Sequence, residues 1–210
     1  MTRGATPLKL MALFAVCLIA ATLRAAPPQK LLVCFGDSIT AGYGLDKSQS
    51  YPADLEHLLA SHGYHYQVVN QGVPGDTTKD ALTRVNQVLA LHPDVVVLEF
   101  GGNDGLRGLS TDLTRRNLNQ LLATLQAAHI RILLVGITLP PHYGPDYVKT
   151  FSAIFKDEAT AHHTALMPMI YDGIYTLPGT IQPDGIHPTI KGSQLIAQHM
   201  FPFLTPLLTK

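Results

Sequence analysis

The chain has 210 residues, of which 46% are hydrophobic, which suits one medium-sized domain with its own core and argues against a disordered chain. Lys and Arg together number 15, as do Asp and Glu, so the formal net charge at pH 7 is zero. This balance excludes the strong fields that favour nucleic acid or an anionic membrane surface, so we expect a small neutral or apolar ligand and no nucleic-acid partner.

The first residues have the order of a secretory signal peptide. Arg3 and Lys9 precede an apolar run over residues 10–21, and small residues follow it. The run is shorter than the roughly 20 residues that a membrane-spanning helix needs, so an uncleaved anchor is the weaker alternative. We expect residues 1–26 to be removed on export and residues 27–210 to form one domain with no stable membrane anchor.

The cysteines cannot form an internal disulfide in the mature chain. Cys17 lies in the signal segment, which leaves Cys34 alone. Because Cys34 stands in an apolar strand pattern, we expect a buried and unreactive thiol there.

Apolar runs of strand length alternate with segments of helical period, which is typical of βαβ units around a parallel sheet. Ser50 and Asp76 are the expected N-caps of the first two helices. The sequence therefore predicts an α/β fold, a three-layer α/β/α domain with a central parallel sheet of about five strands. In chain order the pattern predicts a strand over 31–35, a helix over 50–63, a strand over 66–70, a helix over 77–91, a strand over 95–100, a helix over 112–128, a strand over 131–137, a helix over 145–162, a strand over 165–170 and a last helix from residue 188.

Loops that contain glycine follow the first three predicted strands, and another lies near the end of the chain. In a parallel sheet, ligands bind beyond the carboxyl ends of the strands, so we expect any chemistry among these loops. They are Gly36-Asp37-Ser38, residues 72–76, Gly101-Gly102-Asn103-Asp104 and Asp184-Gly185-Ile186-His187-Pro188.

Acyl transfer needs a hydroxyl nucleophile, a base that takes its proton and a carboxylate that orients the base. Ser38 supplies the hydroxyl, because Gly36 permits a tight turn that exposes it. His187 is the candidate base, and Asp184 can accept a hydrogen bond from its Nδ1 if the short loop folds back. Pro188 keeps His187 outside the last helix, because a residue before proline avoids helical geometry. The catalytic candidates are therefore Ser38, Asp184 and His187.

The oxyanion of acyl transfer needs hydrogen-bond donors. The candidates are the backbone amide of Ser38, the side-chain amide of Asn103 and a glycine amide of the 72–76 loop. Gly75 suits the role because a residue without Cβ lets a carbonyl oxygen approach closely, but spacing alone does not decide between Gly72 and Gly75.

Each of these residues also has an ordinary structural interpretation. Ser38 alone is a turn residue, Gly75-Asp76 a turn with an N-cap, and Asn103 an Asx-turn residue. Independent turn residues have no reason, however, to supply every group of a serine esterase once each at one sheet edge. No dinucleotide-binding fingerprint, P-loop or G-x-S-x-G elbow follows a strand, so we expect no cofactor and no metal, on a scaffold other than the α/β-hydrolase fold.

Four blocks of the sequence, GDSITAGYG, PGDTT, GGNDGLRG and DGIHP, resemble the SGNH (GDSL) hydrolase family. The stretches VVLEFGGNDGLRGL and ITLPPHYG are similar to its bacterial thioesterase I, lysophospholipase L1 and arylesterase subgroup. The resemblance implies a flavodoxin-like fold with Ser38 as nucleophile, completed by Asp184 and His187. It also implies an oxyanion hole of Ser38, Gly75 and Asn103, because the family's glycine directly precedes Asp-Thr.

The same resemblance implies the substrates and their contacts. Family members hydrolyse lysophospholipids, acyl thioesters and aryl or short-chain esters without a cofactor. The proline-rich segment 139–147 resembles the subgroup's loop beside the acyl groove, which makes Leu139, Pro140 and Tyr143 candidate substrate contacts. An ordinary connection is the alternative for that segment.

We expect a monomer that acts in the periplasm or outside the cell on a small-molecule acyl ester or thioester. Gly72 and Pro74 replace small polar residues of the subgroup, which leaves the width of the acyl site open. Two rival functions remain: a carbohydrate O-acetylesterase with the same triad, and a catalytically silent module that binds lipids or glycans.

Overall fold

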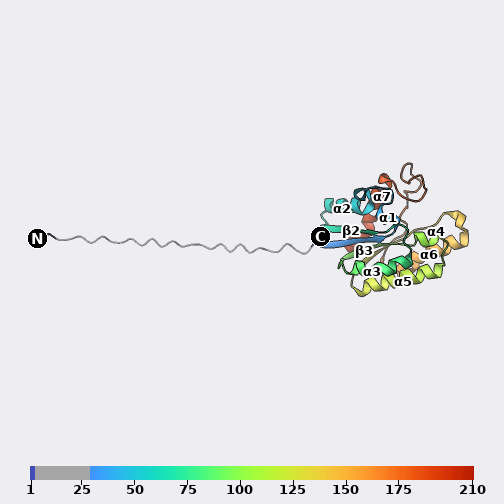
Figure 1. Ribbon diagram of the computed structural model, residues 1–210, viewed down its shortest axis with the longest axis horizontal. Coiled ribbons are helices and arrows are strands. Elements are labelled where there is room, and N and C mark those ends of the chain that lie inside the picture. Colours follow the sequence, from blue (N-terminus) through green and yellow to red (C-terminus); the bar gives the residue numbers. More distant parts are fainter. Residues whose placement is uncertain (3–28) are drawn as a thin grey trace.

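The computed structural model describes residues 1–2 and 29–210. Apart from its first two residues, the predicted signal peptide lies outside the described residues, and so does Cys17. Residues 29–210 form three layers, a sheet with helices on both of its faces (Figure 1). Within the described ranges, no helix combines the length and apolar character that crossing a membrane requires.

The sheet consists of five parallel strands in the order β2-β1-β3-β4-β5. The chain builds outward from β1 to β2 and then, on the other side, from β3 to β5, so its direction reverses between β1 and β3. This order is flavodoxin-like, and such a reversal opens a crevice outside the carboxyl ends of the two strands. The predicted α/β fold is confirmed. The strands are β1 Lys30–Gly36, β2 Tyr66–Gly72, β3 Val95–Glu99, β4 Arg131–Val135 and β5 Ala165–Met167.

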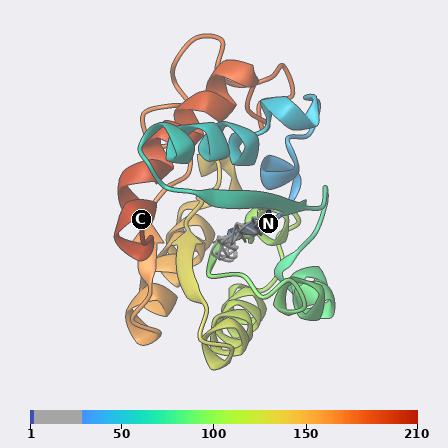
Figure 2. The same ribbon diagram turned by 90° about the vertical axis from the view of Figure 1, so that its left-hand side faces the viewer.

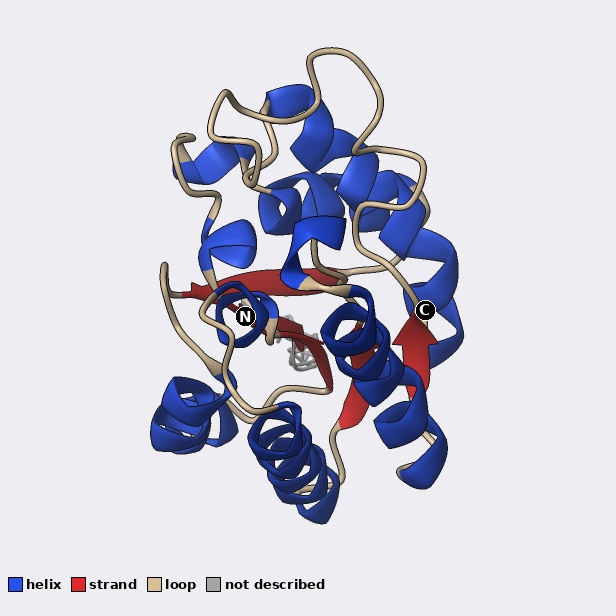
Figure 3. Cartoon of the chain, turned by 90° about the vertical axis from the view of Figure 1, so that its right-hand side faces the viewer, coloured by secondary structure: helices blue, strands red, loops and turns tan. Residues whose placement is uncertain are grey.

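Helices cover both faces of the sheet. Figure 2 shows α2 and α7 on one side and α3, α5 and α6 on the other, and Figure 3 shows helices on both sides of the strands. The two short helices α1 and α4 follow β1 and β3 directly, at the crevice, and the sequence pattern did not predict them. The helices are α1 Ser38–Ala41, α2 Tyr51–Ser61, α3 Thr78–Leu89, α4 Gly102–Leu106, α5 Thr111–Ala127, α6 Pro145–Ala161 and α7 Ile190–Leu204, with 3-10 turns at Lys47–Gln49, Pro141–Tyr143 and Thr205–Leu207.

The alternation of side chains along β1 divides the core in two. Val33 and Phe35 pack with α3, α5 and α6, whereas Leu32 and Cys34 pack with α2 and α7. All four are fully buried, which explains why the strand reads as one apolar run. Cys34 is a buried free thiol, as its strand pattern predicted, and burial raises its pKa.

The N-cap of α3 is Thr77, so the predicted cap at Asp76 is wrong. The Thr77 side chain accepts from the backbone amide of Asp80, and the Asp80 carboxylate accepts from the Thr77 amide at 2.9 Å, a capping box. Asp76 instead forms an ion pair with Arg84 at 2.6 Å. Thr77 caps the helix in place of Asp76 because Asp80, three positions after Thr77, can accept the hydrogen bond of the Thr77 amide.

Two other boundaries differ from the pattern because of prolines. β5 ends at Met167, since Pro168 has no amide hydrogen for a further ladder bond. α7 begins at Ile190 with Thr189 as N-cap, two residues after Pro188. His187 therefore lies in the loop before this helix.

Candidate active site

Ser38 lies at the carboxyl end of β1, where the chain turns sharply into α1. Asp37 is the N-cap of α1, and its Oδ1 accepts from the amide of Ile39 at 3.0 Å. Gly36 makes the turn possible, because a Cβ at that position would lie 2.0 Å from Thr40 Oγ1. The first helical residue, Ser38, is consequently held in a rigid corner at the crevice.

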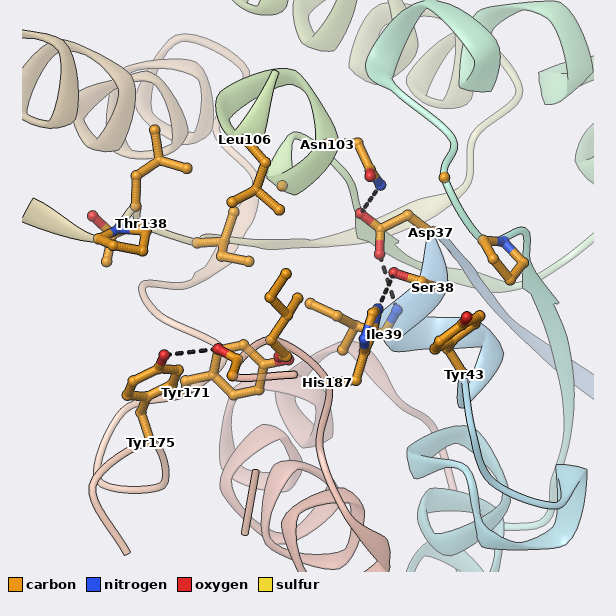
Figure 4. A pocket seen from close by; sticks show the side chains of 18 of the residues that line it. Asp37, Ser38, Ile39, Tyr43, Asn103, Leu106, Thr138, Tyr171, Tyr175 and His187 are labelled. Carbon is orange, nitrogen blue, oxygen red and sulfur yellow. Dashed lines mark hydrogen bonds between the residues drawn. The ribbon is translucent and has the colours of Figure 1, made fainter. Parts of the chain in front are cut away.

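The loop from Asp184 to His187 folds back and brings its imidazole to Ser38. His187 Nε2 lies 2.9 Å from Ser38 Oγ (Figure 4). On the other side of the ring, His187 Nδ1 lies 2.7 Å from Asp184 Oδ2. Because a carboxylate only accepts, Nδ1 donates to Asp184 and Nε2 is left to accept the hydroxyl proton of Ser38. The three predicted catalytic residues thus form one hydrogen-bonded chain, across 149 positions of sequence between Ser38 and His187.

Asp184 is held in its charged form by the same loop. Partial burial opposes ionisation, but hydrogen bonds from the His187 ring and from the amides of His187 and Ile186 outweigh it and lower the pKa of Asp184 to about 2. Its Oδ1 accepts from those amides at 3.0 and 2.9 Å. The carboxylate therefore stays negative beside the imidazole throughout the neutral range.

Three tyrosines that sequence reasoning missed surround the His187 loop. The ring of Tyr43 packs against the imidazole with centroids 4.6 Å apart and the ring planes tilted by 38°. The hydroxyls of Tyr171 and Tyr175 donate to the carbonyls of Ile186 and Gly185, at 2.9 and 2.7 Å. Tyr43 lies inside the GDSITAGYG block, but no local pattern could have connected Tyr171 or Tyr175 with a loop that folds back.

Gly75 and Gly72 have different tasks. Gly75 has a φ of +88° and lines the cavity beside Ser38. A Cβ on Gly72 would lie 2.1 Å from the backbone nitrogen of Ala41, so Gly72 permits the close packing of α1 on β2. Arg107 secures the Gly75 turn by donating to the Gly75 carbonyl at 2.7 Å. Of the two glycines, only Gly75 lines the cavity, where its backbone amide could donate to an oxyanion.

Asn103 is the second residue of α4 and lines the same cavity. Its Nδ2 donates to Asp37 Oδ2 at 3.1 Å and to the carbonyl of Asp76 at 3.0 Å. These bonds orient the amide and tie together the loops after β1, β2 and β3. Ser38, Gly75 and Asn103, the three predicted oxyanion residues, therefore meet at one cavity.

A buried acidic pair lies behind the nucleophile, and the sequence analysis did not single it out. Asp37 and Glu99 are each 1% exposed. Glu99 Oε2 accepts from Thr40 Oγ1 at 2.8 Å and from the amide of Asp37 at 3.4 Å, while Oε1 has no hydrogen-bond partner within the described chain. Burial raises the pKa of Asp37 to about 6, and burial followed by the Asp37 charge raises that of Glu99 well above its usual range. Burial thus favours the uncharged form of Glu99.

The site opens into a cavity of about 520 Å³ with mainly apolar walls. Leu139 and Pro140 line it, as predicted for the proline-rich segment. Tyr143 does not, because the 3-10 turn over Pro141–Tyr143 directs its hydroxyl to the carbonyl of Leu106 at 3.0 Å. Leu106 itself lines the cavity, so Tyr143 supports the wall rather than forming it.

Further apolar side chains line the cavity that sequence reasoning did not predict as wall residues. They include Leu106, Ile137, Met169 and Ile186. Among residues 29–210, no group of three or more His, Cys, Asp or Glu side chains converges as metal ligands would.

Residues 34–195 match the GDSL-like Lipase/Acylhydrolase family. Esterase TesA of Pseudomonas aeruginosa is 40% identical over 193 residues, which cover 91% of this chain and 96% of that protein. Thioesterase 1/protease 1/lysophospholipase L1 of Escherichia coli K12 is 38% identical over 192 residues, 91% of this chain and 90% of that protein. A crystal structure of TesA aligns with a TM-score of 0.81 and 42% identity over 86% of this chain and 100% of the other. The chain belongs to the GDSL-like lipase/acylhydrolase family and is a hydrolase of ester bonds.

Proposed function

We propose that the protein hydrolyses carboxylic esters and thioesters through an acyl-enzyme on Ser38, with His187 as base and Asp184 as its orienting carboxylate. The observation that carries this proposal is the continuous hydrogen-bonded chain from Ser38 Oγ through His187 to Asp184, at the wall of an apolar cavity. A carboxylate, an imidazole and a hydroxyl in this order are the parts of a serine hydrolase triad.

Acylation starts when Ser38 Oγ attacks the carbonyl carbon and His187 Nε2 takes the hydroxyl proton. The imidazolium that forms is stabilised by Asp184, which is charged across the neutral range. The oxyanion accepts hydrogen bonds from the amides of Ser38 and Gly75 and from Asn103 Nδ2, which turns from Asp37 toward the oxyanion. His187 then protonates the leaving alcohol or thiol, which departs from the acyl-Ser38.

Deacylation repeats these steps with water. His187 Nε2 removes a proton from the water as its oxygen attacks the acyl carbon, and the same donors hold the second oxyanion. Collapse of that intermediate returns the proton from Nε2 to Ser38 Oγ and releases the carboxylic acid.

The cavity supports an apolar acyl group as the recognised part of the substrate. Walls of Leu, Ile, Met and Pro favour an acyl chain or an aryl group, as in a lysophospholipid, an acyl thioester or an aryl ester. The names of the relatives, an esterase and a thioesterase/lysophospholipase, cover the same ester and thioester chemistry. A carbohydrate O-acetylesterase would need a shorter and more polar pocket than this one.

We also propose that residues 1–26 direct export and are removed, so that residues 27–210 act as a monomer in the periplasm or outside the cell. The support for export is the order of basic, apolar and small residues at the N-terminus. N-terminal sequencing of the protein recovered from the periplasm and from the medium tests the cleavage site and the compartment together.

The central test is a panel of p-nitrophenyl esters and acyl thioesters of increasing chain length, with Ser38→Ala as control. We expect the rate to rise from acetyl to medium-length acyl groups and a fluorophosphonate to label Ser38. Turnover that is greatest for acetylated sugars would favour the O-acetylesterase. Full turnover by Ser38→Ala would overturn the mechanism, and a Ser38 inert to both substrates and probe would leave the lipid- or glycan-binding module.

A further inference from the structure

One side chain outside the triad connects the segment of the nucleophile with the loop of the base. Gln182 Nε2 donates to the carbonyl of Tyr43 at 2.8 Å and to the carbonyl of Pro188 at 2.8 Å. Because both acceptors are carbonyl oxygens, only the NH₂ end of the amide fits between them. The two hydrogens of this one group thus bridge two segments that are far apart in sequence.

Each acceptor is a direct neighbour of a catalytic group. The amide of Tyr43 donates to the carbonyl of Ser38 at 3.0 Å, so Tyr43 is fastened to the nucleophile's own backbone. Pro188 follows His187 in the chain, and the amide of Gln182 donates to the carbonyl of His187 at 2.8 Å. Gln182 therefore holds two successive carbonyls of this loop, those of His187 and Pro188.

The two segments share few other polar contacts. Within residues 29–210, hydrogen bonds between segments 37–45 and 180–190 are limited to those of Gln182 and the bond from Ser38 to His187 itself. The hydroxyls of Tyr171 and Tyr175 anchor the exposed residues Ile186 and Gly185 by their carbonyls. Among the described residues, Gln182 supplies the hydrogen bonds that link this loop to segment 37–45 besides the bond between His187 and Ser38, so the position of the imidazole relative to Ser38 also depends on the Gln182 amide.

The neighbouring residues are shaped around this side chain. A Cβ on Gly44 would lie 2.6 Å from Gln182 Oε1, so a glycine there leaves room for the amide. The Tyr43 carbonyl that Gln182 holds belongs to the residue whose ring packs against the imidazole, with centroids 4.6 Å apart. One amide thereby fixes both the loop and the aromatic ring beside His187.

We propose that Gln182 is a positioning residue that holds His187 Nε2 at hydrogen-bond distance from Ser38 Oγ by clamping the two segments together. The inference rests on the proposed function, since it assigns Gln182 a task in the transfer of the Ser38 proton. Gln182 does not line the cavity and so touches no substrate. Its loss changes the geometry of proton transfer and leaves acyl binding intact.

The test replaces Gln182 with Met, which has a similar length and no donor, and with Glu, which has the same shape and two acceptors. We expect each variant to lower kcat about 10- to 100-fold, because a displacement of about 1 Å in a catalytic group has effects of that order. KM is expected to stay within about twofold, since substrate contacts are unchanged. We also expect the rate constant for labelling of Ser38 by a fluorophosphonate to fall by a factor similar to that of kcat. This rate constant is measured for the folded molecules only, so a loss of stability does not affect it.

Gln126 provides a matched control far from the triad in the fold. Its amide also bridges two groups of another segment, with Nε2 donating to the carbonyl of His162 at 2.7 Å and Oε1 2.9 Å from His162 Nδ1. It does not line the catalytic cavity. Gln126→Met is expected to lower the unfolding temperature without changing kcat or the labelling rate.

A double-variant cycle separates positioning from general damage. In a His187→Ala background, Gln182→Met is expected to cause no further loss of the residual rate, because the group that it positions is gone. The inference is overturned if the kcat of Gln182→Met stays within twofold of wild type. It is also overturned if Gln182→Met lowers the rate by the same factor in the presence and in the absence of His187. Ser38→Ala reports on the proposed function separately: if it is inactive while Gln182→Met keeps full activity, only the role of Gln182 fails.

Discussion

The carboxylate of Asp184 holds His187 at two points, since Oδ2 lies 2.7 Å from the ring Nδ1 and Oδ1 accepts from the backbone amide at 3.0 Å. A single side chain thus fixes the position of the residue and the orientation of its ring. Because the acceptor is a carboxylate, it also selects the form of the imidazole that carries a proton on Nδ1.

Asp184→Asn is expected to retain the fold and to lose most of the activity. The amide can still accept from the backbone, but its NH₂ group cannot accept from Nδ1, so the imidazole presents the wrong nitrogen to Ser38. We expect kcat to fall about 10³- to 10⁴-fold, as in triads where only the tautomer is disturbed. Steady-state kinetics with a p-nitrophenyl ester measure this, and a loss of less than tenfold would contradict the assigned role.

Asn103→Ala is expected to lower kcat about 10²- to 10³-fold with a small change in KM, because one oxyanion donor is removed. The variant also loses the bonds to Asp37 and to the Asp76 carbonyl, so its unfolding temperature should fall. Asn117→Ala is the matched control, since Asn117 donates to Thr78 Oγ1 at 3.0 Å and does not line the cavity. Equal losses of kcat in the two variants would refute an oxyanion role for Asn103.

Glu99→Gln is expected to change the free energy of unfolding by at most about 1 kcal/mol. Glu99→Ala is expected to lower it by about 2–4 kcal/mol. Burial raises the pKa of Glu99 well above its usual range and so favours its uncharged form, which an amide of the same shape imitates. Its oxygen can accept from Thr40 and Asp37 as Oε2 does. Alanine leaves both donors without an acceptor and opens a cavity beneath Ser38.

Urea unfolding at pH 7 distinguishes the two Glu99 variants. If glutamine proved as costly as alanine, Glu99 would have to be charged in the folded protein, contrary to its buried position.

Asp37 is expected to make the protein less stable as the pH rises from about 4 to about 6. Burial raises the pKa of Asp37 to about 6 in the folded state, whereas an unfolded Asp loses its proton near pH 4. In that interval the folded state binds more protons, so the free energy of unfolding falls with rising pH. We expect a decrease of at most about 3 kcal/mol, from a pKa shift of about two units.

The measurement compares urea unfolding of wild type and Asp37→Asn at several pH values from 4 to 7. Groups that do not interact with Asp37 cancel in the difference. Glu99 does not cancel, because the Asp37 charge contributes to its raised pKa, so the difference reports on the acidic pair. Parallel stability curves would mean that the carboxyl of Asp37 is not protonated in the folded state near pH 5.

The architecture was predictable because its signals are local. Residues 95–98 are apolar throughout because both sheet faces are covered, and the helices between the strands carry a stripe of apolar residues. Boundaries were less predictable where two neighbours compete for one task, as Asp76 and Thr77 do for the cap of α3. The short helices α1 and α4 lack a hydrophobic period altogether, since each has at most five residues.

The predicted site residues share a different kind of signal. Ser38, Asn103 and Gly75 come directly after strands, and parallel strands end at one edge of a sheet, so their approach follows from the fold class. Asp184 and His187 are three positions apart, so their contact needs only a tight loop. The roles of these residues in catalysis stay predictions, to be decided by the variants above.

The sequence by itself determined the fold class and the candidates for the triad and the oxyanion hole, because periodicity, turn residues and strand ends are properties of a few neighbouring positions. Only the tertiary structure decided that Gln182 bridges Tyr43 to Pro188, that Glu99 Oε1 has no hydrogen-bond partner among the described residues, and that Tyr143 supports Leu106 instead of lining the cavity. Such contacts join residues as much as 139 positions apart. They depend on the path of the whole chain, on which no local pattern carries information.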